Sequence, residues 1–83
     1  MSKREKRREA VMKSASVKNI TFEELCLFVE DLGFIAHKGS GTSHRVYAKT
    51  GVVEIINLQE DNGGKAKPYQ VRQVRKIVLA YHL

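Results

Sequence analysis

Two segments of this chain repeat apolar residues at helical spacing, and the segment between them does not. The repeats are Phe22, Leu25, Cys26, Phe28, Val29 and Leu32 in the first, and Val71, Val74, Ile77 and Val78 in the second. Such spacing is typical of helices that bury one face. The segment between them is rich in β-branched residues and glycine-containing turns, which favours strands. The order of these patterns constrains the fold more than any other feature.

The ends of both helices carry recognisable signals. Thr21 and Glu24 form a capping-box pattern, and Gly33 follows the first apolar repeat as a stop signal. Pro68 suits the first turn of the second helix. The sequence therefore predicts one helix over residues 22–32 and another that begins at Pro68.

Three strands are expected between the helices, over residues 34–38, 43–48 and 52–58. The glycine-rich run at 39–42 and the turn at 49–51 connect them, and such short connections favour antiparallel pairing. The chain is therefore predicted to be an α+β protein with two layers and the order α-β-β-β-α. Both helices are expected on one face of a three-stranded antiparallel sheet.

Side chains alternate between the two faces of a strand, which divides the second strand into two sets. His44, Val46 and Ala48 are expected on one face, and Arg45 and Tyr47 on the other. The first strand is expected to direct Phe34 and Ala36 to the same face as each other.

The chain has 83 residues, which is room for one domain. We expect residues 1–18 to be a basic arm, helical or frayed, that contributes no core, and residues 19–83 to be the domain. Cys26 is the one cysteine, so no internal disulfide can form. The sequence has neither the apolar run that spans a membrane nor a signal peptide, so we expect a cytoplasmic protein.

Positive charge gathers at the two ends of the sequence. The net charge is +6; residues 1–18 carry seven Lys/Arg against two Glu, and residues 62–83 carry five Lys/Arg and no acid. The middle carries three basic and seven acidic residues. A polyanion such as nucleic acid is the natural partner of such a chain. A solvated tail and a solvated helix face would give the same pattern, and charge alone does not separate the two interpretations.

Several strings of the sequence resemble the HicA family of toxins. These are "FEELCLFVEDLGF", then "GTSHRVY", a hydrophobic strand, and "GGKAKPYQVRQVRKIV". The resemblance covers roughly residues 19–80. The turn "GSGTSH" is longer than the usual Gly-Ser-His form of the family, and the basic arm is longer than in its shortest members.

The resemblance implies a fold similar to a double-stranded-RNA-binding domain and ribosome-independent cleavage of mRNA. It implies that His44, the histidine of the glycine-Ser-His motif, is the catalytic residue. It also implies a partner, a HicB-type antitoxin that covers this histidine and blocks access of RNA.

The residues around His44 suit this chemistry. A ribonuclease needs a group that takes the proton of the 2′-OH, an acid for the leaving oxygen and cations for the phosphate. A histidine suits proton transfer near neutral pH. We expect an RNA-binding set of Lys38, Thr42, Ser43 and Arg45 around the turn, and Lys65, Lys67, Arg72, Arg75 and Lys76 on and before the last helix. His37 is a weaker candidate that could face the same cleft.

Other chemistry finds little support in the sequence. The histidines and Cys26 lack metal-ligand spacing, and the glycines match no phosphate loop, so we expect neither metal nor cofactor. Cys26 is expected to be packed in the core, while Tyr47 and Tyr69 could stack on bases or be half-buried. Two alternatives stay open: a non-catalytic RNA-binding module of the same fold, and a protein whose basic surfaces meet an acidic partner.

Overall fold

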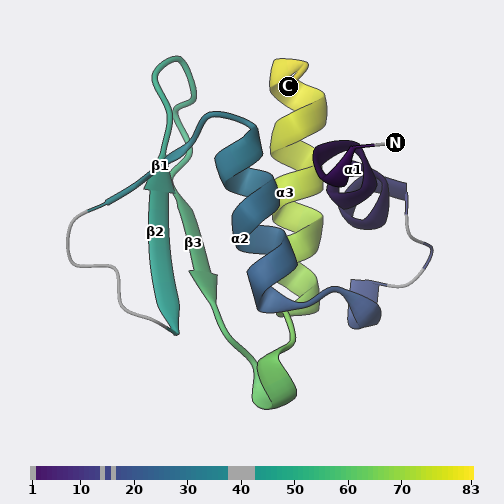
Figure 1. The fold of residues 1–83 in the computed structure, drawn as a ribbon. Coiled ribbons are helices and arrows are strands. Elements are labelled where there is room, and N and C mark those ends of the chain that lie inside the picture. Colours follow the sequence, from purple (N-terminus) through teal and green to yellow (C-terminus); the bar gives the residue numbers. More distant parts are fainter. Residues whose placement is uncertain (1, 14, 16, 38–42) are drawn as a thin grey trace.

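The computed structural model describes residues 2–13, 15, 17–37 and 43–83. The elements run in the order α1 (Lys3–Lys13), a 3-10 turn η1 (Val17–Asn19), α2 (Phe22–Asp31), β1 (Ile35–Ala36), β2 (His44–Ala48), β3 (Ile56–Gln59), a 3-10 turn η2 (Asn62–Gly64) and α3 (Pro68–Tyr81). The three strands form one antiparallel sheet in the order β1-β2-β3. All the helices lie on one side of this sheet (Figure 1). The predicted α+β class and the α-β-β-β-α core are confirmed.

The local signals at α2 act as the sequence predicts. The Glu24 amide donates to Thr21 Oγ1 at 3.0 Å, and the Thr21 amide donates back to Glu24 Oε1 at 3.3 Å, which completes the capping box. After the helix, Gly33 has φ +96°, a conformation that glycine adopts without steric cost. These two ends fix α2 within one residue of the predicted segment.

The core lies between the helices and the inner face of the sheet. From the sheet it receives Tyr47, Ile56 and Leu58, which are fully buried. The helices supply the remaining apolar side chains, notably Phe22, Leu25, Cys26, Phe28, Val29, Val71, Val74, Ile77 and Val78. Cys26 is buried as predicted, and this burial raises the pKa of its thiol, which disfavours the reactive thiolate. Tyr47 is fully buried and its hydroxyl donates to Glu30, so it is not a base-stacking residue.

The basic N-terminal segment is the largest correction to the sequence analysis. Helix α1 packs against α2 and α3, and its Val11 is fully buried in the core (Figure 1). Arg7 clamps the Asp31 carboxylate with two hydrogen bonds of 2.8 and 3.0 Å. Arg75 Nε donates to the carbonyl of Val11 at 2.6 Å. The prediction that this segment contributes no core is therefore wrong. Helix α1 has only one fully buried apolar residue, Val11, and hydrogen bonds from arginine side chains supply the rest of its attachment to the domain.

The third strand begins later than its β-branched residues suggest. Residues 52–55 form no strand, and Val53 is 88% exposed. Instead, the Val53 amide donates to the Tyr81 hydroxyl at 3.3 Å, and that hydroxyl donates to Glu54 at 2.6 Å. In the register of β2 with β3, residues 52–54 fall opposite residues beyond the end of β2 at Ala48, and β-propensity without a partner strand does not form a sheet.

Candidate nucleic-acid site on the open face of the sheet

The register of the strands divides their side chains between a face that the helices cover and a face that they leave open. His44 lies opposite Gln59, and Val46 lies opposite Asn57. The His37 amide donates to the carbonyl of Val46 at 2.7 Å, which continues the ladder by one residue beyond β1. Opposed residues share a face, so these five side chains belong to the open face, away from Tyr47, Ile56 and Leu58.

His44 opens β2 and is exposed, as the glycine-Ser-His motif predicts. Its Nε2 forms a short hydrogen bond with Oδ1 of Asn57, its diagonal neighbour on β3. An amide oxygen can only accept, so Nε2 carries the proton and Nδ1 is the basic nitrogen of the neutral ring. The contact therefore sets both the tautomer and the orientation of the imidazole.

Asn57 is not among the residues that the sequence predicts for this site, although the structure places it against His44. The signal that could have found it is the alternation along β3, where Ile56 and Leu58 are buried and Asn57 and Gln59 are exposed. A polar residue on the outer face of a strand is usually only solvated, however, and the sequence does not tell which residue faces His44. The strand register decides that.

Lys67 is the cation that the described contacts bring to this face. Its Nζ donates to Oε1 of Gln59 at 3.2 Å, and Gln59 lies directly opposite His44. A second contact holds the start of α3 against this end of β3: the side-chain oxygen of buried Gln70 accepts from the backbone amide of Gln59 at 3.0 Å. The prediction placed Lys67 in the RNA-binding set, and the structure brings it to the same end of the sheet as His44.

The other residues expected near His44 fall into three groups. Ser43 is exposed beside it, and the Ser43 carbonyl accepts from the Glu60 amide at 2.9 Å, which fixes the start of β2. Lys65 is exposed just before α3. Lys38 and Thr42 lie outside the described residues.

Arg45 is separated from His44 because successive side chains of a strand point to opposite faces. Its guanidinium lies 5.7 Å from the centroid of the Phe22 ring and 4.0 and 3.9 Å from the carboxylates of Glu23 and Glu30. The expectation that Arg45 stabilises a phosphate beside His44 is thus not supported by the geometry. The arginine instead packs α2 against the inner side of the sheet.

The basic residues of α3 are not equivalent. Arg72 and Lys76 are exposed one turn apart, as predicted. Arg75 is half-buried, and it donates a hydrogen bond to the Val11 carbonyl that holds α1 against α3. Helical periodicity places Arg75 beside Lys76, but it cannot show that a third helix covers this side of α3.

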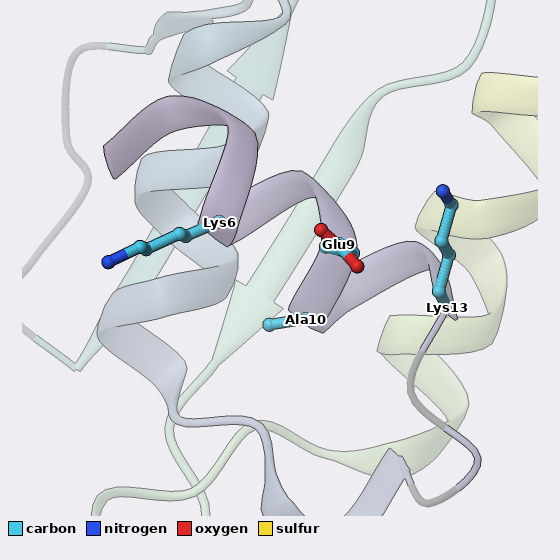
Figure 2. Close-up of a pocket in the computed structure, with 4 residues that line it drawn as sticks. All are labelled: Lys6, Glu9, Ala10 and Lys13. Atoms are coloured by element: carbon cyan, nitrogen blue, oxygen red, sulfur yellow. The ribbon is translucent and has the colours of Figure 1, made fainter. Parts of the chain in front are cut away.

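The described surface also has hollows away from His44. One is a shallow depression on the outer side of α1, lined by Lys6, Glu9, Ala10 and Lys13 (Figure 2). Four side chains of one helix form no enclosure, and Figure 2 shows Lys6 and Lys13 pointing away from each other. A phosphate backbone is read on an open surface rather than in a closed cavity, so the open face of the sheet is the better candidate site.

Among the described residues there is neither a cluster of metal-ligating side chains nor a helix suited to span a membrane. No three His, Cys, Asp or Glu side chains gather there as a possible set of metal ligands. In the same part of the chain, no helix combines the length and the apolar character that crossing a membrane requires.

Comparison of the chain with protein-family models, with curated proteins and with solved structures gave no match.

Proposed function

We propose that this chain is a HicA-type toxin that binds RNA on the open face of its sheet and cleaves mRNA in the cytoplasm with His44. One observation carries the proposal. An exposed histidine has its Nε2 held by Asn57, and Lys67 is bound to Gln59, the residue directly opposite that histidine. Proton transfer and phosphate binding are the two tasks of an RNA-cleaving site, and these side chains are of the types that perform them.

The tautomer assigns the chemical role of the ring. With Nε2–H directed to Asn57, the unprotonated Nδ1 accepts the proton of a 2′-OH as that oxygen attacks the neighbouring phosphorus. The imidazolium that forms is stabilised by the same hydrogen bond, because a charged donor strengthens it. Lys67 offsets negative charge on the phosphate oxygens.

The resemblance to HicA proteins also supplies the second partner. A HicB-type antitoxin would cover the open face and exclude RNA from His44. No described helix of this chain covers that face (Figure 1), so the face is available to a partner.

Two exposed histidines allow a matched test. His44→Ala removes the proposed base, whereas His82→Asn changes a histidine at the opposite end of α3. Asparagine suits that position because His82 has φ 55°, in the left-handed region. Induced expression of the wild type and of His82→Asn should arrest growth and degrade mRNA, and His44→Ala should do neither.

The purified proteins separate cleavage from binding. Wild type should cut single-stranded RNA in the presence of EDTA, and His44→Ala should bind that RNA but leave it intact. Binding without cleavage by the wild type would favour a non-catalytic RNA-binding module. RNA affinity that stays flat between low and high salt would contradict any phosphate-binding surface and favour an acidic protein partner.

A further inference from the structure

His37 occupies a position that the proposed function leaves unused. It lies opposite Val46 on the neighbouring strand, and His44 is two residues before Val46 on the same face. His37 follows β1 directly, so extension of the β1–β2 register makes His37 and His44 diagonal positions on the open face of the sheet. Both side chains are exposed. Two imidazoles on one open face can contact opposite sides of one phosphodiester.

We propose that His37 is a second catalytic residue, the general acid that protonates the leaving 5′-oxygen. This inference rests on the proposed function, in which His44 is the base. Cleavage by an internal 2′-OH needs two proton transfers, one from the attacking oxygen and one to the leaving oxygen. A single histidine that has just accepted the first proton cannot deliver the second from the opposite side of the phosphorus in the same step.

The other described side chains of this face are poor candidates for the acid. Val46 has no proton to give, and Asn57 and Gln59 carry neutral amides that do not act as acids. Lys67 is the charged group that the described contacts bring here, and the proposed function already assigns it to the phosphate charge. The carboxyl groups of Glu23 and Glu30 bind Arg45 on the covered side of the sheet.

The step balances without any further reactant. His44 Nδ1 takes the proton of the 2′-OH, the O2′–P bond forms, the P–O5′ bond breaks, and protonated His37 gives its proton to O5′. The products are a 2′,3′-cyclic phosphate and a 5′-hydroxyl end. Wild-type cleavage should leave these two ends on the RNA.

A substrate with a better leaving group tests the assignment directly. The bond that wild type cuts is first mapped on an RNA oligonucleotide, and a second oligonucleotide then carries sulfur in place of the 5′-oxygen at that bond. A thiolate leaves without protonation, so the loss of a general acid no longer slows the reaction. His37→Ala and His37→Gln should cleave the oxygen substrate at least about a hundredfold more slowly than wild type and the sulfur substrate within about threefold of it. His44→Ala should stay slow on both substrates.

The outcomes distinguish a failure of the proposed RNA-cleaving function from a failure of the role given to His37. If wild type cleaves neither substrate, the proposed function fails and this inference fails with it. If wild type cleaves and the His37 variants match it on the oxygen substrate, or are slow on both substrates, His37 is not the acid although the toxin function stands. Rescue of His44→Ala by sulfur would likewise overturn the assignment. Circular dichroism and thermal melting of each variant show that the comparison is made on folded protein.

Discussion

Replacing Val11 by alanine tests whether helix α1 is part of the folded domain. The side chain of Val11 is 0% exposed, and the substitution removes two buried carbons. Their lost transfer free energy is about 1.6 kcal/mol, and the remaining cavity raises the cost to roughly 2 kcal/mol. A chain of this length is expected to be stable by only about 4–12 kcal/mol, so the loss is a large fraction of the total.

The same substitution at an exposed valine provides the control. Val53 is 88% exposed, and Val53→Ala should change the free energy of unfolding by less than about 0.5 kcal/mol. Urea unfolding followed by circular dichroism measures both variants. With a slope of about 1 kcal/mol per molar urea for a small domain, Val11→Ala should lower the midpoint by roughly 2 M and leave the slope unchanged.

Two results would refute the reasoning. If Val11→Ala unfolds within about 0.5 kcal/mol of Val53→Ala, α1 contributes nothing to global stability and residues 1–18 are the arm that the sequence analysis expected. If hydrogen exchange shows that only the α1 amides lose protection in Val11→Ala, the helix is bound to the domain but unfolds separately from it.

Three further predictions concern the site and the core. Asn57→Ala should lower the rate of RNA cleavage about tenfold to a hundredfold, which is less than the effect of His44→Ala, because the imidazole keeps its basic nitrogen but loses its fixed orientation. The control is Asn62→Ala, which replaces an exposed asparagine in η2 and should cleave like wild type. Lys67→Gln should reduce the slope of log affinity for RNA against log salt by about 1, and an unchanged slope would remove Lys67 from the phosphate contacts. Burial and the hydrogen bond to Glu30 raise the pKa of Tyr47, so the unfolded chain loses the phenol proton at lower pH than the folded protein does. Above about pH 10 the free energy of unfolding should therefore fall by up to about 1.4 kcal/mol per pH unit. A Tyr47→Phe variant whose free energy of unfolding falls as steeply with pH as that of wild type would contradict this.

The alternation of side chains along β2 predicts part of the candidate site and leaves part of it undecided. The alternation along residues 43–48 predicts His44 and Arg45 on opposite faces, and the structure confirms this. The prediction of both in one RNA-binding set rests on their position beside the turn. The contacts of Arg45 with Phe22, Glu23 and Glu30 come from α2, and twelve residues separate the end of that helix from the start of β2. Sequence adjacency on a strand does not give spatial adjacency, since the strand itself stands between the two side chains.

The local patterns of the sequence were sufficient for the ends of α2, the start of α3 and the burial of Cys26. Capping, helix-breaking and periodic burial depend on residues within a few positions of each other, so a single sequence contains them. The α+β order followed from the same patterns because short connections leave few ways to arrange the elements.

Only the tertiary structure decided that Asn57 faces His44, that Lys67 reaches Gln59, that Arg75 holds α1, and that the strand after Gly51 starts at Ile56. Each of these depends on strand register or on the docking of one helix on another. Strand register and helix docking depend on many contacts between residues that are distant in the chain. A local pattern of residue types does not show which distant residues meet.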